Sequence, residues 1–315
     1  MKASEIFEEY IGKSIRPIVV AYEPYKDNFK TFPYRHVFDS DFEQEFSKIM
    51  FNSIVFYAYE KSEIEHEYSR GHFAKLSKVA RMAYENRVPK TERENDGLLG
   101  ELALDTFVKC FFEHIEMLYS RVKYLERYPK KEIEDKRKGH EVKGYDSLLF
   151  SVENQQKYMW IGQVKTGSWE YCSKGIKEDI NKSILEHYFS SAMMIMADVM
   201  HSMNSNSPIL QKVIDDLNEI IFENTGDTAL IHSNIQKYFF DENIIIRVPC
   251  MMIVDESNYE NETQILNVIK EKCKSSFDGF VQNKNNNLNV EVFLLVFPVR
   301  NLQLLRKLFL NERNE

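Results

Sequence analysis

The stretch KGYDSLLFSVENQQKYMWIGQVKTG, residues 143–167, decides the fold of this chain of 315 residues. Two runs with β-like composition, 145–152 and 157–165, flank the polar residues 153–156. Short apolar and aromatic runs that are separated by a few polar residues are typical of a β-hairpin. The stretch therefore predicts two antiparallel strands joined by a hairpin loop.

Polar residues gather on one face of this predicted hairpin. Gln163 and Lys165 are two residues apart, so both project from the same face of their strand. A loop centred between Asn154 and Gln155 places Asp146 directly opposite Gln163, with their β-carbons about 4.5 to 5.5 Å apart. The pattern predicts a patch made by Asp146, Gln163 and Lys165.

Residues 98–128 upstream predict a long amphipathic helix. Its apolar stripe recurs at spacings of three and four and consists of Leu104, Val108, Phe111, Ile115, Leu118, Val122 and Leu125. Extending the stripe back by three residues reaches Glu101, where the pattern calls for an apolar side chain. Glu101 can reach the patch if the stripe packs on the same sheet. Taken alone, a glutamate near a helix start is equally explained by the helix dipole.

Two carboxylates on one patch create an electrostatic conflict. At an effective dielectric constant of about 20, charges about 4 Å apart repel by roughly 4 kcal/mol, and one lysine offsets only part of this. A divalent cation would remove the conflict. Oxygen ligands favour Mg²⁺ or Mn²⁺ over zinc. Each residue taken alone also has an ordinary structural explanation, so the prediction of a metal site rests on the combination.

The rest of the chain alternates predicted helices and strands. A strand is expected within 16–22, helices within 42–84 and at 177–203, 208–222, 262–274 and 302–310, and strands at 244–254 and 290–299. This order predicts an α/β (α+β) fold with a mixed central sheet flanked by helices. The polar stretch TERENDG, 91–97, is typical of a linker. We therefore expect a helix-rich N-terminal subdomain in residues 1–94, for packing or partner docking, and a second domain in residues 95–315.

The composition excludes several classes of protein. With 41 basic and 49 acidic residues the net charge is -8, so the chain as a whole does not attract nucleic acid or an anionic membrane. The four cysteines have no C-x-x-C spacing, which disfavours zinc ribbons and suits a reducing compartment. No apolar run approaches the length of about 18 residues that a membrane span needs. We expect a cytoplasmic protein without a membrane contact.

A local basic strip follows the second predicted strand. Residues 157–177 contain Lys157, Lys165, Lys174 and Lys177 against the single acid Glu170, with Trp169 and Tyr171 between them. Lysines can follow a phosphate backbone while an aromatic ring stacks on a base. Lys157, Trp169, Lys174 and Lys177 are therefore predicted DNA contacts. A solvated loop with one aromatic side chain in the core explains the same strip equally well.

The order of a helix Glu, a strand Asp and a strand Gln-x-Lys resembles the PD-(D/E)xK nuclease superfamily. More narrowly, GELALDTFVKCFFEH (100–114), KGYDSLLF (143–150) and MWIGQVKTG (159–167) resemble the HamA family, the nuclease subunits of the Hachiman antiphage system. The segments RVPCMMIVDE (247–256) and VEVFLLVFPVRN (290–301) are similar to the closing strands of that family. The resemblance covers roughly residues 95–310.

This resemblance implies a set of roles for the patch. Glu101, Asp146 and Gln163, with the carbonyl oxygen of Val164, would hold Mg²⁺ (or Mn²⁺), and Lys165 would be the catalytic lysine of phosphodiester hydrolysis. The family's usual acid is replaced by the neutral Gln163. The resemblance also implies a DNA nuclease that works beside a helicase (HamB-like) partner. The alternatives are a catalytically inactive docking or sensor subunit, and a restriction-type or RNA-directed nuclease.

Overall fold

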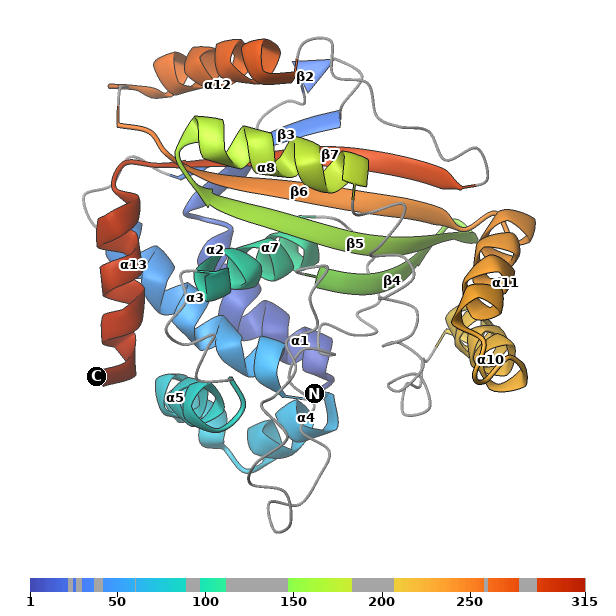
Figure 1. Ribbon diagram of the computed structural model, residues 1–315. Coiled ribbons are helices and arrows are strands. Elements are labelled where there is room, and N and C mark those ends of the chain that lie inside the picture. Colours follow the sequence, from blue (N-terminus) through green and yellow to red (C-terminus); the bar gives the residue numbers. More distant parts are fainter. Residues whose placement is uncertain are drawn as a thin grey trace, which may run out of the picture.

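The computed structural model places helices on both faces of one mixed β-sheet (Figure 1). The structure describes residues 1–21, 25–26, 30–36, 42–59, 61–88, 97–111, 147–182, 207–257, 260–277 and 288–314. No helix in these ranges combines the length and the apolar character that crossing a membrane requires. The predicted fold class, a mixed central sheet flanked by helices, is confirmed.

Seven strands form the described sheet. They are β1 (Val19–Ala21), β2 (Tyr25–Lys26), β3 (Lys30–His36), β4 (Ser147–Glu153), β5 (Gln156–Gly167), β6 (Ile245–Asp255) and β7 (Asn289–Val299). Their order is β1-β3-β7-β6-β5-β4, and β2 pairs with β3. β3, β5, β6 and β7 are mutually parallel, whereas β4 is antiparallel to β5. The parallel strands therefore end at the same edge of the sheet.

Helices cover the two faces of this sheet separately. One face, here called the α7 face, carries α1 (Ala3–Phe7), the π-helical turn η1 (Glu8–Gly12), α2 (Lys13–Ile15), α3 (Phe42–Ala58), α4 (Lys61–Ser69), the 3₁₀ turn η2 (His72–Lys75), α5 (Leu76–Asn86), α7 (Gly97–Phe111) and α13 (Leu302–Asn311), which runs into η5 (Glu312–Asn314). The other, the α8 face, carries α8 (Trp169–Lys182), α10 (Pro208–Glu223), α11 (Thr228–Asp241) and α12 (Glu262–Phe277). Strand residues alternate between the faces, so Trp160 lies in the core of the α7 face and Ile161 in that of the α8 face.

The predicted hairpin is confirmed, with a tighter turn than expected. Glu153 pairs with Gln156, so the loop is only Asn154 and Gln155, which have φ angles of 49° and 67°. Two consecutive residues with positive φ are typical of a type I′ turn, which suits the twist of the two strands. The register pairs Ser147 with Gly162 and has the predicted centre.

Most other predicted elements are also present. The helices expected at 208–222, 262–274 and 302–310 are α10, α12 and α13, and the strands expected at 244–254 and 290–299 are β6 and β7. β1 lies within the predicted N-terminal strand. The amphipathic helix predicted from residue 98 is α7, and the continuation of its stripe beyond Phe111 lies outside the described residues.

Several elements differ from the sequence-based expectation, including β2 and the short helical segments of residues 3–15, for which no element was expected. The helix expected to begin at residue 177 begins at Trp169, where the Ser168 hydroxyl accepts a hydrogen bond from the backbone N–H of Tyr171. α11 was not predicted; its N-cap is Asp227, which accepts from the N–H of Leu230. β3 was not predicted either. Both missed helix starts follow a Ser or Asp cap, the usual signal for a helix beginning.

The N-terminal region shares its core with the sheet. Buried side chains of α1, α3 and α5 form one cluster with Trp160 of β5 and Phe297 of β7. β3 also pairs with β7 and so extends the sheet. The boundary predicted after residue 94 falls within 89–96, outside the described residues. The division into residues 1–94 and 95–315 therefore stays a prediction. Residues from both parts pack into one hydrophobic core.

Candidate active site

The predicted site residues of β5 lie at its carboxyl-terminal end. The described pairing of β5 with β4 reaches Gly162, whereas its pairing with β6 continues to Gly167. Residues 164–167 are half-buried, in contrast to the buried middle of the strand. This end of β5 therefore extends beyond the described part of β4 and is partly exposed.

Alternation divides these residues between the two faces. A β-carbon added to Gly100 of α7 would lie 2.9 Å from Cγ2 of Thr166, so Thr166 points to the α7 face. A β-carbon added to Gly175 of α8 would lie 3.0 Å from Cε of Lys165, so Lys165 points to the α8 face. Gln163 shares the face of Lys165 because the two are separated by one residue. The predicted Gln-x-Lys pair therefore faces α8.

Lys165 forms an ion pair that sequence reasoning missed. Its Nζ lies 2.7 Å from Oδ2 of Asp179 in α8, and the side chains are only 27% and 14% exposed. Asp179 follows Gly175 by one helical turn, so the helix places the small residue and the carboxylate on one line. A Gly-x-x-x-Asp spacing directly after the lysine strand was the available signal.

Gln163 is a buried amide in the carboxyl-terminal half of β5. Its residue is 3% exposed, and it stands in register with Cys250 of β6. Continuing the β4–β5 register by one residue beyond Ser147 and Gly162 puts Asp146 opposite Gln163. Asp146 itself lies outside the described residues, so its pairing stays a prediction.

Glu101 lies on the α7 face, on the other side of the sheet from Gln163 and Lys165. It is buried, and its Oε2 accepts a 2.6 Å hydrogen bond from the hydroxyl of Tyr57 in α3. The stripe that begins at Glu101 does pack on the sheet, as predicted, but on the face opposite the patch. The role of Glu101 as a metal ligand stays a prediction.

A second buried polar pair follows Glu101 along α7. Asp105 and Lys109 form an ion pair of 2.5 Å, with side chains only 3% and 4% exposed. Glu101, Asp105 and Lys109 are spaced by four residues and therefore lie along one side of the helix. The apolar period of the sequence points to Glu101 alone, because Asp105 and Lys109 lie on the polar side of the stripe.

The model of the HamA family matches residues 16–312, nearly the whole chain. The chain belongs to the HamA family. No curated protein and no solved structure matches it. The HamA match begins at residue 16 and so includes the N-terminal helices, whereas the resemblance drawn from motifs began near residue 95.

The residues predicted to hold a metal offer oxygen donors. The buried amide of Gln163 and the carbonyl of Val164 would be joined by the carboxylate of Asp146, a set that suits a hard cation such as Mg²⁺. Burial raises the pKa of the nearby Cys172 thiol in α8 to about 12, so it stays protonated and is a poor ligand. In the described ranges, no three His, Cys, Asp or Glu side chains come together.

The basic strip of this HamA member is not gathered at the site. Lys157 pairs with Glu242 at the opposite end of β5, about 26 Å from Lys165 at about 3.3 Å per strand residue. The Trp169 ring is buried, and its indole N–H donates to the Ser276 hydroxyl at 2.8 Å. Stacking of Trp169 on a base would therefore require α12 to move away.

The remaining members of the strip differ in exposure. Lys177 donates to the backbone oxygen of Ser276 at 2.9 Å, so its ammonium is turned to α12. Lys174 is exposed on α8, and the ring of Tyr171 is 62% exposed beside Gly167. Lys174 and Tyr171 are thus the surface residues of the strip near the end of β5.

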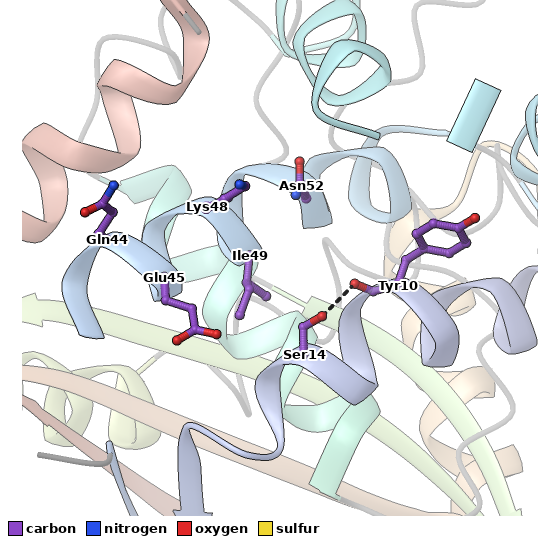
Figure 2. A pocket seen from close by; sticks show the side chains of 7 residues that line it. All are labelled: Tyr10, Ser14, Gln44, Glu45, Lys48, Ile49 and Asn52. Atoms are coloured by element: carbon purple, nitrogen blue, oxygen red, sulfur yellow. Dashed lines mark hydrogen bonds between the residues drawn. The ribbon is translucent and has the colours of Figure 1, made fainter. Parts of the chain in front are cut away.

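A hollow of about 510 Å³ lies elsewhere, on the N-terminal helices (Figure 2). It is lined by Tyr10, Ser14, Gln44, Glu45, Lys48, Ile49 and Asn52. Glu45 and Ile49 of α3 point toward Ser14, whose hydroxyl donates to the backbone oxygen of Tyr10 (Figure 2). This hollow is part of the region that the sequence predicts for partner docking, not of the candidate active site.

Proposed function

We propose that this HamA family member is the Mg²⁺-dependent nuclease subunit of a Hachiman antiphage system, which hydrolyses phosphodiester bonds of DNA under the control of a helicase partner. The observation that carries the proposal is the ammonium of Lys165 on the same sheet face as the buried Gln163, at the half-buried end of the strand. A cation beside oxygen donors can stabilise the negative charge that develops on the phosphate during hydrolysis.

The side chains of the patch would divide the chemistry between them. Asp146, Gln163 and the carbonyl of Val164 would hold Mg²⁺. Glu101, the further ligand that the family resemblance implies, lies on the α7 face, where Tyr57 donates to it, and is separated from Gln163 by the sheet. Bound Mg²⁺ supplies a water molecule with a lowered pKa and neutralises phosphate charge. Lys165 would orient that water or stabilise the negative charge that develops on the phosphate. Manganese would fit the same oxygen donors.

Contact with DNA would use few charges. Lys174 and Tyr171 are exposed near the strand end, so an ammonium and a ring are available to a phosphate and a base. Since each phosphate contact adds about 0.9 to the slope of log affinity against log salt, a chain of net charge -8 with few exposed contacts should bind DNA weakly. Delivery to DNA by the helicase partner would compensate for this weakness.

The test combines the purified chain, a HamB-like helicase of the same system, ATP and Mg²⁺. We expect DNA to be cleaved only when the partner and Mg²⁺ are present, and the chain alone to bind duplex DNA weakly with a shallow salt dependence. Tight binding by the isolated chain, or cleavage that is indifferent to the partner and to ATP, would overturn the partner-controlled model. Cleavage of RNA but not DNA would favour the RNA-directed alternative.

One observation favours a second function. Gln163 is a neutral amide where the family resemblance implies an acid, which weakens the attraction for a cation. A catalytically inactive docking or sensor subunit would use the same fold without hydrolysis. Stable binding of the partner and DNA, with no cleavage at any Mg²⁺ or Mn²⁺ concentration, would support this alternative and contradict the nuclease.

A further inference from the structure

The side chain of Lys165 lies along the surface of α8. A β-carbon at Gly175 would come within 3.0 Å of Cε, 3.2 Å of Cδ and 3.3 Å of Cγ of Lys165. Three successive methylene carbons therefore pass directly beneath this glycine. Beyond it, the ammonium reaches the carboxylate of Asp179 at 2.7 Å.

The direction of this path points back toward Gln163. α8 begins two residues after β5 ends and lies along β5 and β6 (Figure 1), so it runs in the opposite sense to β5. From Gly175 to Asp179 the helix advances about 6 Å. From Lys165 back to Gln163 the strand covers about 6.6 Å. Asp179 therefore lies further back along β5 than Gly175, on the side of Gln163.

On the described strands β5 and β6, the level of Gln163 carries no charged side chain. Gln163 is neutral, and the neighbouring residue in register on β6 is the thiol Cys250. Asp179 brings a carboxylate to the α8 face from the helix and not from the strand. Its attachment to a rigid helix fixes the end point of the flexible lysine chain.

We infer that Asp179 is a positioning residue of the nuclease site, which holds the Lys165 ammonium on the side of Gln163 through the clearance left by Gly175. The inference rests on the proposed nuclease function, because Lys165 is catalytic only if the chain cleaves a phosphodiester. Asp179 would restrict the Lys165 side chain to few rotamers. Its ammonium is then already close to the phosphate when DNA binds, which lowers the entropy cost of the reaction.

The first test asks whether the pair is coupled, and it needs no activity. Melting temperatures are measured for Asp179→Asn, Lys165→Met and the double variant, all without metal. Asp179→Asn should lower the melting temperature of the wild-type chain but raise that of Lys165→Met, since a buried carboxylate without its cation is unfavourable. Equal shifts in both backgrounds would overturn the inference.

The second test asks whether the coupling serves the reaction. With DNA, Mg²⁺ and the helicase partner, Asp179→Asn should lower kcat by about tenfold or more with little change in KM, as expected for an interaction that acts in the transition state. Asp179→Glu keeps the charge and should retain more activity than Asp179→Asn. Glu178→Gln removes the same charge from an exposed position of α8 and is the matched control.

The outcomes separate this inference from the proposed function. An Asp179→Asn rate equal to that of Glu178→Gln, with an active wild-type chain, would overturn the role of Asp179 and leave the nuclease standing. A wild-type chain that cleaves nothing would overturn the nuclease itself. If Asp179→Asn does not fold, Gly175→Ala can replace it. The added β-carbon would displace the methylene chain of Lys165 and should lower kcat in the same way.

Discussion

The hydroxyl of Tyr57 in α3 donates a 2.6 Å hydrogen bond to Oε2 of Glu101 in α7. Both residues are buried, and they join the N-terminal helical layer to the helix that carries a predicted metal ligand. A change in the position of α3 therefore reaches the carboxylate of Glu101 directly. The N-terminal residues matter to the site even though they carry no predicted catalytic group.

Removing this hydroxyl should destabilise the protein. Tyr57→Phe leaves the buried Glu101 carboxylate without this donor, so the free energy of unfolding should fall by about 1–3 kcal/mol. Urea denaturation measures the change. Tyr171→Phe removes a hydroxyl from a ring that is 62% exposed and is the control. Equal stability of the two variants would contradict the importance of the bond.

The predicted catalytic pair should be essential for cleavage. Asp146→Ala and Lys165→Ala should each lower the cleavage rate at least about 100-fold, because each removes a charge that would act on the metal or the phosphate. Circular dichroism checks that the fold is intact. Lys212→Ala on α10, whose side chain is 66% exposed, is the control. Full Mg²⁺-dependent activity of Asp146→Ala, with contaminating nucleases excluded, would show that Asp146 is not a metal ligand.

Gln163→Glu should strengthen metal binding. The added negative charge should lower the Mg²⁺ concentration for half-maximal activity several-fold. Because Gln163 is buried, the new carboxylate should also lower the melting temperature without metal, and Mg²⁺ should restore it. A metal requirement that is unchanged or weaker would mean that Gln163 is structural.

A side chain at Gly100, where α7 packs closely against β5, should destabilise the protein. Gly100→Ala would bring a β-carbon to 2.9 Å from Cγ2 of Thr166, which should cost about 1–3 kcal/mol of stability. Gly97 in the same helix has nothing within 4 Å of such a carbon. Gly97→Ala should therefore be neutral or stabilising by up to about 1 kcal/mol. Thermal unfolding compares the two, and an equal effect would refute the close contact.

The buried thiols should be inert in the folded protein. Burial raises the pKa of Cys110, Cys172 and Cys273 to about 12. Even at pH 9 only about one thiol in a thousand is then ionised, and the thiolate is the reactive form. Titration with Ellman's reagent between pH 7 and 9 should be slow before unfolding and complete in guanidinium chloride. Rapid native labelling that rises with pH would contradict the burial of these thiols.

The sequence was informative where local rules apply. The hairpin register followed from the centre of the loop between Asn154 and Gln155, since one pairing fixes all the others along two strands. The helix from residue 98 followed from its apolar period. These features depend on neighbours in the chain, so no distant contact was needed to predict them.

The sequence was uninformative where distant segments meet. Asp179 reaches Lys165 only because α8 folds back over β5, and Trp169 is buried by Ser276, which is 107 residues further along the chain. The sequence also could not predict the face of the sheet on which α7 packs, because an apolar stripe shows which side of a helix is buried but not which face of the sheet it contacts. For this reason the sequence grouped Glu101 with a patch that faces the other way.

Gly100 and Gly175 approach the same end of β5 from opposite faces of the sheet, one against Val164 and Thr166, the other against Lys165. Both helices can pack this closely against the strand because neither glycine has a side chain. The two contacts constrain substitutions differently: a larger residue at Gly100 can be offset by a smaller one at Val164 or Thr166, whereas a smaller residue at Lys165 would remove the ammonium that the proposed reaction uses. Compensating pairs should therefore accumulate at the Gly100 contact, while Gly175 should stay glycine wherever Lys165 is kept.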